Sequence, residues 1–123
     1  MKWAIDLDQT ITSNPDFFRF LIQLLSKNGV EVHSLTARNT LKRSEETEGE
    51  FRMLGLYYLK NNPIILHTMP KHDPDWKKQA EWKISKVKEI KPDIWIDNDF
   101  KMWERIFKID LDKELSGITR LQI

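Results

Sequence analysis

The 123-residue sequence contains no cysteine. This absence excludes disulfide bonds, thiol catalysis and thiolate metal sites, and it is typical of proteins in the reducing cytoplasm. The sequence also lacks any apolar run near the roughly 20 residues that a membrane-spanning helix needs. Asp6 and Asp8 interrupt the apolar N-terminal stretch that a signal peptide would require. We therefore expect a cytoplasmic protein that has no contact with a membrane.

An excess of charge of either sign is also missing. The 20 basic and 19 acidic residues give a net charge of +1, so nothing supports broad electrostatic binding to nucleic acid. The length and the 40% share of hydrophobic residues fit a soluble globular protein with one core. Because no repeat or change in composition divides the chain, we expect a single domain over residues 1–123. Its oligomeric state stays open.

Apolar runs of strand length alternate with amphipathic helical segments along the whole chain. The predicted strands cover residues 2–7, 30–35, 63–67, 92–97 and 117–123. The predicted helices cover residues 13–29, 44–60, 73–90 and 100–107. This alternation predicts an α/β fold with a parallel sheet and helices on both of its faces.

The first predicted helix has clear start and stop signals. Ser13 or Asn14 can cap its first turn, and Gly29 follows its last one. Apolar residues recur along it at helical spacing, at Phe17, Leu21, Leu24 and Leu25. This spacing predicts the helix.

Polar residues follow each of the first four predicted strands. They are Asp6, Asp8 and Thr10, then Thr36, Ala37 and Arg38, then His67 and Thr68, and finally Asp97, Asn98 and Asp99. Polar turns are a common way to end a strand, and this explains either pair of acids taken alone. In open parallel sheets, however, ligands bind beyond the carboxyl ends of the strands. We therefore expect these side chains to converge on one edge of the sheet.

Clustered carboxylates repel one another unless a cation pairs with them. Oxygen ligands select Mg²⁺ or Ca²⁺, and a site with few carboxylates and room for water and phosphate favours Mg²⁺. The absence of cysteine, and of histidines spaced four apart on a helix, argues against zinc. The candidate metal ligands are Asp6, Asp8, Asp97 and Asp99.

A metal beside carboxylates favours phosphoryl chemistry. One aspartate can attack phosphorus, and a second can give a proton to the leaving oxygen and later take one from water. The two-residue spacing of Asp6 and Asp8 predicts that both side chains point to the same side. Thr36 and a lysine would supply the hydrogen bonds and positive charge that the phosphoryl oxygens need.

Four segments resemble the motifs of the haloacid dehalogenase (HAD) superfamily, whose phosphatases use an aspartyl phosphate. "DLDQT", residues 6–10, resembles the first motif, DxDxT, and "SLTAR", residues 34–38, resembles the second. "KISKVKEIKPDIWID" resembles the lysine-containing third motif and the strand after it, and "WIDND" resembles the acidic fourth motif. The four occur in the family's order and cover nearly the whole chain.

The resemblance implies a role for each matching residue. Asp6 would be the nucleophile and a Mg²⁺ ligand, and Asp8 the general acid and base, with its backbone carbonyl on the metal. Thr36 would bind the phosphoryl group, and Lys83, or Lys86 one turn away, would neutralise its charge. Asp97 or Asp99 would be the remaining direct metal ligand. Thr10 and Arg38 are candidate substrate-binding residues.

The resemblance further implies a three-layer, Rossmann-like fold and a Mg²⁺-dependent phosphatase. Too few residues lie between the motifs for a sizeable cap domain, so we expect an open site for a phosphorylated small molecule or an accessible macromolecular phosphate. The loop "HTMPKHDPDW" is the candidate specificity element. In it, His67 and His72 are either phosphate or metal ligands or solvent-exposed and capping residues. Trp76 and Trp82 are either stacking or core residues.

Three other kinds of protein share parts of this pattern. A response-regulator receiver gathers similar residues, but its lysine follows the last strand with a motif residue, whereas Lys83 precedes Asp97. A Toprim-like enzyme needs a glutamate after the first strand, which is missing. A non-catalytic HAD-like module that binds a protein or nucleic acid is the alternative from another functional class.

Overall fold

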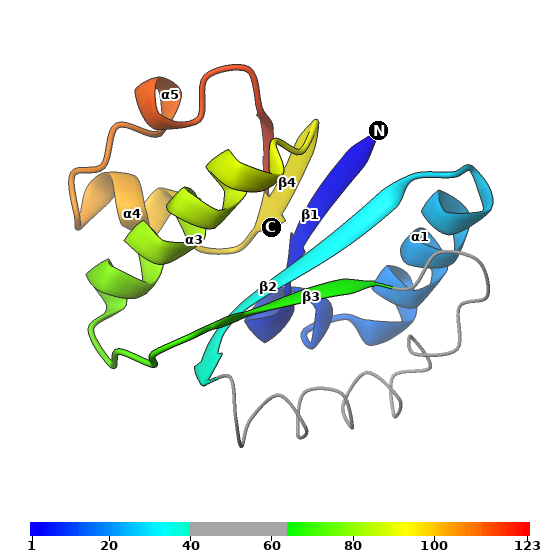
Figure 1. Cartoon of the computed structure of the whole chain (residues 1–123), viewed down its shortest axis with the longest axis horizontal. Coiled ribbons are helices and arrows are strands. Elements are labelled where there is room, and N and C mark those ends of the chain that lie inside the picture. Colours follow the sequence, from blue (N-terminus) through cyan, green and yellow to red (C-terminus); the bar gives the residue numbers. More distant parts are fainter. Residues whose placement is uncertain (40–63) are drawn as a thin grey trace.

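The structure is a computed structural model that describes residues 1–39 and 64–123 (Figure 1). Five parallel strands form one sheet in the order β3-β2-β1-β4-β5. The strands are β1 (Lys2–Asp6), β2 (Glu31–Asn39), β3 (Ile65–Met69), β4 (Ile94–Asp97) and β5 (Thr119–Gln122). The predicted α/β class with a parallel sheet is confirmed, and this order of strands is Rossmann-like.

Helices follow strands β1, β3 and β4. They are α1 (Pro15–Lys27), α3 (Trp76–Ile90), α4 (Phe100–Arg105) and α5 (Leu111–Glu114), and a short wide turn, η1 (Leu7–Ile11), follows β1. None of the helices in these described segments is long and apolar enough to cross a membrane. The helix predicted over residues 44–60 lies outside the described residues, and α5 was not predicted.

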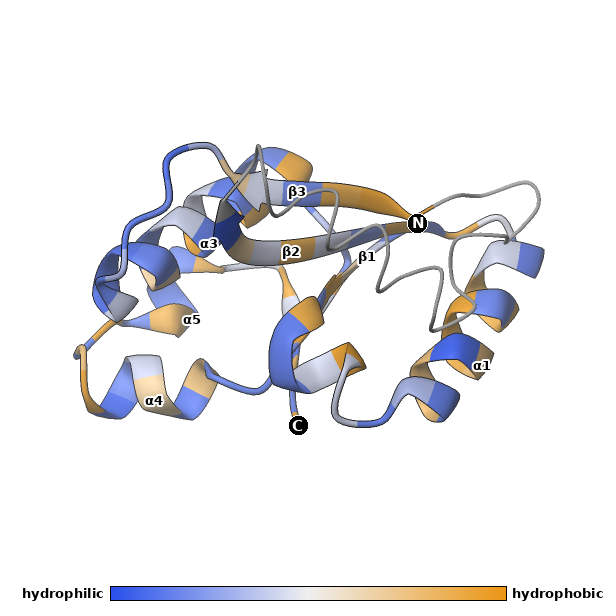
Figure 2. Ribbon diagram, turned by 90° about the horizontal axis from the view of Figure 1, so that it is seen from below, coloured by the Kyte–Doolittle hydropathy of each residue, from blue (hydrophilic) through white to orange (hydrophobic). Residues whose placement is uncertain are grey.

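Two hydrophobic clusters hold the helices against the sheet. Ala4 and Ile5 are neighbours along β1, yet each belongs to a different cluster, because side chains of a strand alternate between its two faces. Ala4 belongs with residues of α3, α4 and α5, and Ile5 with residues of α1. Figure 2 accordingly shows α1 on the opposite side of the molecule from α3, α4 and α5.

Helix α1 begins and ends close to where the sequence predicts, but its buried face agrees only in part with the predicted one. Asn14 caps it by accepting a hydrogen bond from the backbone of Phe17. Of the residues whose spacing predicted the helix, Leu25 is buried, while Phe17 and Leu24 are 50% and 48% exposed. The buried face instead contains Phe18, Ile22 and Leu25. Several apolar stripes run along this helix, and contact with the sheet selects among them.

Strands β2 and β3 extend beyond their predicted ends. Thr36 lies within β2 and pairs with Thr68 of β3, and the register shifts between Thr36 and Asn39. Polar residues at these positions suggested loops, but strand pairing overrides that local preference. Thr36 therefore lies on a paired strand rather than in a turn, which fixes its backbone close to the first strand.

The site predicted at the strand ends lies where the order of strands reverses. From β1 the chain continues outward to β2 and β3, and it then returns to place β4 on the other side of β1. Asp6 is the last residue of β1, and Asp97 is the last residue of β4. Because β1 and β4 are paired and parallel, these two acids lie beside each other at the crevice where such sheets bind ligands.

Candidate active site

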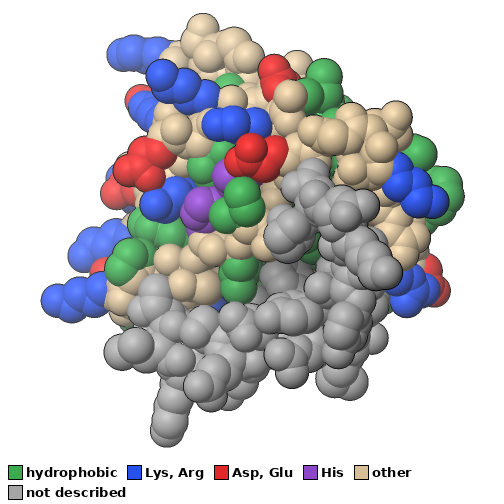
Figure 3. Space-filling model, turned by 45° about the vertical axis from the view of Figure 1, so that its right-hand side comes forward, with side chains coloured by type: hydrophobic (Ala, Val, Ile, Leu, Met, Phe, Trp, Pro, Cys, Tyr) green, Lys and Arg blue, Asp and Glu red, His purple; other side chains and the backbone are tan. Residues whose placement is uncertain are grey.

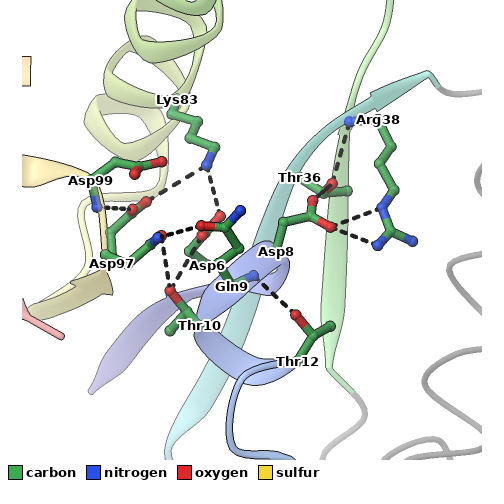
Figure 4. A network of polar contacts seen from close by, with 11 residues as sticks. Asp6, Asp8, Gln9, Thr10, Thr12, Thr36, Arg38, Lys83, Asp97 and Asp99 are labelled. Carbon is green, nitrogen blue, oxygen red and sulfur yellow. Dashed lines mark hydrogen bonds and ion pairs between the residues drawn. The ribbon is translucent and has the colours of Figure 1, made fainter. Parts of the chain in front are cut away.

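A buried lysine joins the two aspartates that end β1 and β4. The Nζ atom of Lys83, from α3, donates a hydrogen bond to Oδ1 of Asp6 at 2.7 Å and lies 3.7 Å from Oδ2 of Asp97 (Figure 4). Asp6 is 1% exposed and Asp97 0%. The ammonium group also lies 5.9 Å from the centre of the Trp103 ring, so it has an aromatic face on one side. Two carboxylates thus share one cation.

Burial and charge shift the pKa values of all three groups. Burial, followed by the charge of Asp97, raises the pKa of Asp6 well above its usual value, although Lys83 opposes this shift. Burial also raises the pKa of Asp97, again against the effect of Lys83. Burial lowers the pKa of Lys83, but the charges of Asp6 and Asp97 outweigh it and raise this pKa above its usual range. The two buried carboxylates therefore resist being ionised together beside a single lysine.

The second acid of the first motif binds different partners. Oδ1 of Asp8 accepts hydrogen bonds from Nε and Nη2 of Arg38 at 3.1 and 2.6 Å. Its Oδ2 accepts one from the hydroxyl of Thr36 at 2.7 Å. The expected common direction of Asp6 and Asp8 is not observed: Figure 4 shows Asp8 turned toward β2 and Asp6 toward α3. The reason is that β1 ends at Asp6, so strand alternation does not continue to Asp8.

The turn after β1 has an unusual backbone that brings it to the loop after β4. Gln9 has φ of 60° and ψ of 4°, the left-handed region that non-glycine residues rarely adopt. Its backbone N–H donates to the hydroxyl of Thr12, and its side-chain oxygen accepts from the amide of Asn98 at 3.3 Å. The hydroxyl of Thr10 lies 3.3 Å from Oδ2 of Asp6 and 3.4 Å from the side-chain oxygen of Asn98. These contacts link the two loops.

The acidic groups fit a partial metal site. The four predicted ligands are not gathered into one group, and no three carboxylates or histidines of the described residues are placed to hold a metal by themselves. Mg²⁺, however, takes only one or two carboxylates and completes its shell with water and phosphate oxygens. Oδ2 of Asp97 is buried and accepts no hydrogen bond from any described residue. Asp6 and Asp97 are therefore the residues that would hold a Mg²⁺ ion at this site.

A cavity of about 330 Å³ opens beside this cluster. Three charged residues of the predicted site line it, namely Asp8, Lys83 and Asp99. Asp99 donates its backbone N–H to Oδ1 of Asp97 at 2.9 Å, so the loop after β4 fixes one oxygen of that carboxylate. The volume lies at the lower end of the range for small-molecule sites.

Several candidate residues from the sequence lie elsewhere. Lys86 pairs with Glu89 at 2.9 Å and not with the cluster. His72 contacts the backbone oxygen of Ala37, and His67 contacts His33 at 2.8 Å. Figure 3 shows histidine side chains together on one face of the molecule. Burial, and then the charge of His33, lowers the pKa of His67 to about 4. Trp82 packs against the core cluster of α3.

Sequence reasoning missed two residues that organise the site. Asn98 was only noted as the residue between two acids, yet its side chain contacts both Thr10 and Gln9. Trp103 lies beneath Lys83, which no local pattern indicates. The only available signal for Asn98 was its place in a polar strand end next to Asp97.

The sequence matches no protein-family model and no curated protein.

Proposed function

We propose that the chain is a Mg²⁺-dependent phosphatase of the HAD type, with a three-layer fold, that hydrolyses a phosphomonoester through a phosphorylated Asp6. The observation that carries this proposal is the buried Asp6–Lys83–Asp97 cluster at the switch point of a parallel sheet. Burying three charged groups is costly, and such perturbed groups cluster at functional sites. The four matching sequence segments supply these residues and the neighbouring Asp8 and Thr36.

In the first step, a carboxylate oxygen of Asp6 attacks phosphorus and the bond to the leaving oxygen breaks. Asp8 lines the cavity and gives its proton to that leaving oxygen. Thr36 and Arg38 donate hydrogen bonds to the carboxylate form of Asp8, which is the form that takes a proton from water in the second step. The products of this step are the free alcohol and an acyl phosphate on Asp6.

In the second step, Asp8 takes a proton from water, and the water oxygen attacks phosphorus. The phosphate leaves, and Asp6 returns as a carboxylate. Lys83 lies close enough to Asp6 to balance negative charge in both steps. A Mg²⁺ ion held by Asp6 and Asp97 would supply further positive charge for the phosphoryl oxygens.

The test is release of 4-nitrophenol from 4-nitrophenyl phosphate by the purified protein, with Mg²⁺ or with a chelator. We expect turnover that requires Mg²⁺ and is lost in Asp6→Asn. Asp16→Asn is the matched control, because Asp16 is exposed on α1 and pairs with Arg19. Turnover that persists in Asp6→Asn would contradict the assigned nucleophile. No turnover of nucleotides, sugar phosphates, phosphopeptides or phosphorylated oligonucleotides would favour a non-catalytic binding module.

The metal ligands have a separate test that does not depend on turnover. We expect Mg²⁺ to raise the midpoint of thermal unfolding of the wild-type protein, because a ligand that binds only the folded state stabilises it. Asp97→Asn should remove this effect, whereas Asp16→Asn should keep it. An equal effect of Mg²⁺ on all three proteins would show that the cation acts elsewhere.

A further inference from the structure

One face of α3 leads from the buried lysine to an exposed tryptophan. Trp76, Gln79, Ala80 and Lys83 all line the cavity, and their spacing places them in one stripe along the helix. Trp76 lies at the start of α3 and is 67% exposed, so the core does not account for its side chain. Lys83 lies at the other end of the stripe, bonded to Asp6.

The length of this stripe limits what can contact both ends. Trp76 and Lys83 are seven residues apart, which corresponds to roughly 10 Å along a helix. A phosphoryl group at Asp6 and a ring stacked on Trp76 can therefore belong to one small molecule. A bare phosphate, or a phosphate on a very small alcohol, would leave Trp76 without a contact.

The lining of the cavity combines charged and apolar side chains. Its charged residues are Asp8, Lys83 and Asp99, while Ala37, Ala80, Met102 and Trp103 supply apolar surface. Trp103 is buried and packed edge-on against Phe100, so its place is fixed. The amide nitrogen of Gln79 donates to the backbone oxygen of Asp73 at 2.7 Å, which fixes this side chain between the two ends.

We infer that the cavity selects phosphomonoesters whose leaving group contains a planar aromatic ring, and that Trp76 stacks on this ring. The inference rests on the proposed phosphatase function and adds the class of substrate. Aryl phosphates and nucleoside monophosphates both have this chemistry. Stacking on an exposed tryptophan accepts many rings, so discrimination should be strongest between aromatic and non-aromatic leaving groups.

The kinetic test compares three substrates in three proteins. The substrates are 4-nitrophenyl phosphate, adenosine 5′-monophosphate and glycerol 3-phosphate, and the proteins are wild type, Trp76→Ala and Trp76→Phe. In Trp76→Ala we expect kcat/KM to fall about tenfold for a ring-containing substrate and to fall far less for glycerol 3-phosphate. Trp76→Phe should recover most of the loss. Comparing each substrate with itself across the proteins cancels its intrinsic reactivity.

Comparing adenosine monophosphate with 4-nitrophenyl phosphate distinguishes a site for nucleotides from a site for aromatic leaving groups in general. A tenfold loss for adenosine monophosphate alone identifies a nucleotide site, and a loss for both identifies a general aromatic site. Phe20→Ala is the control, because Phe20 is an exposed aromatic residue of α1 and does not line the cavity. We expect Phe20→Ala to leave kcat/KM at the wild-type value for all three substrates. An equal loss for all three substrates in Trp76→Ala would overturn the inference and leave the phosphatase function in place.

A binding measurement keeps the inference testable if no substrate is turned over. Calorimetry would measure the affinity of adenosine monophosphate and of 4-nitrophenyl phosphate for Asp6→Asn and for Asp6→Asn with Trp76→Ala. We expect the second protein to bind at least one of them about tenfold more weakly. Equal affinities for both ligands would overturn the inference, whereas absent turnover with Trp76-dependent binding would overturn only the phosphatase proposal.

Discussion

The two halves of the site contain nearly identical ion pairs in different surroundings. Lys83 Nζ lies 2.7 Å from Oδ1 of Asp6, and Arg38 Nη2 lies 2.6 Å from Oδ1 of Asp8. The side chain of Asp6 is 1% exposed, however, and that of Asp8 is 43% exposed. The two nitrogen–oxygen distances are therefore nearly the same, whereas the exposed fractions of the two aspartate side chains differ. The two halves therefore differ in burial and in the number of carboxylates that share the cation.

Burial makes the ion pairs of the two halves differ in how much they contribute to stability. In the buried half, Asp6 and Asp97 have lost their water and share one ammonium, so each group depends on the others. In the exposed half, water screens the pair of Asp8 and Arg38, and such pairs contribute little to stability. We expect substitutions in the buried half to act on folding and on chemistry, and substitutions in the exposed half to act on chemistry alone.

Lys83→Met should have the largest effect on stability. It leaves Asp6 and Asp97 buried without their cation, and breaking a buried pair costs about 3–5 kcal/mol. Chemical denaturation at neutral pH, with the metal removed by a chelator, measures this loss. Methionine preserves most of the side-chain volume, so packing contributes little to the difference.

A double variant separates lost charge from lost packing. Adding Asp6→Asn to Lys83→Met removes one of the two stranded carboxylates, and we expect it to restore part of the stability. If the double variant is as unstable as Lys83→Met or less stable, the cost does not come from uncompensated charge.

Asp6→Asn should have a smaller effect and one of the opposite sign. It leaves one carboxylate, Asp97, for one ammonium, so we expect a gain on the order of 1 kcal/mol without metal. The sign follows from the raised pKa of Asp6. The folded state binds the proton of the Asp6 carboxyl more tightly than the unfolded state does. Protonation of Asp6 therefore stabilises the wild-type protein at low pH, and this stabilisation is lost as pH rises from about 4 through the pKa of Asp6 in the folded state.

The increase in the free energy of unfolding caused by Asp6→Asn should therefore grow with pH. Denaturation of wild type and Asp6→Asn from about pH 4 to pH 8, both with chelator, measures the difference. A constant difference over this range would mean that the pKa of Asp6 is not raised in the folded protein.

The sequence predicted the site's residues better than their orientations. Alternating strands and helices give a parallel sheet, and the acids at the ends of β1 and β4 follow from this architecture. The direction of Asp8 does not, because it depends on the backbone of the following turn, where Gln9 takes a positive φ. That conformation accompanies contacts with Asn98 and Arg38, which are remote in the sequence.

The choice between two lysines was undetermined for the same physical reason. Lys83 and Lys86 both lie on α3, and helical periodicity alone allows either one to face the site. Contacts of Ala80, Ile84 and Val87 with the sheet fix the rotation of the helix. Only this packing places Lys83 at Asp6 and Lys86 beside Glu89.

Asp8→Asn should barely change stability, by less than about 1 kcal/mol, because its pair with Arg38 is half-exposed. Its effect on turnover should be large and should depend on the leaving group. We expect kcat/KM for glycerol 3-phosphate to fall by about 10²–10⁴, since this alcohol must be protonated as it leaves. The value for 4-nitrophenyl phosphate should fall much less, because nitrophenolate leaves without a proton. An equal fall for both substrates would contradict the role of Asp8 as the acid.

Lys86→Met should have the smallest effect and is the control for the buried lysine. The variant removes the same charge from the same helix, one turn away from Lys83, but Lys86 pairs with Glu89 across a spacing of three residues. Pairs of this kind contribute about 0.2–0.5 kcal/mol to a helix. We expect the free energy of unfolding to change by no more than this, and the turnover of 4-nitrophenyl phosphate to stay at the wild-type rate. A loss of turnover here, with Lys83→Met still active, would reverse the assignment of the two lysines and with it the contrast between buried and exposed charge.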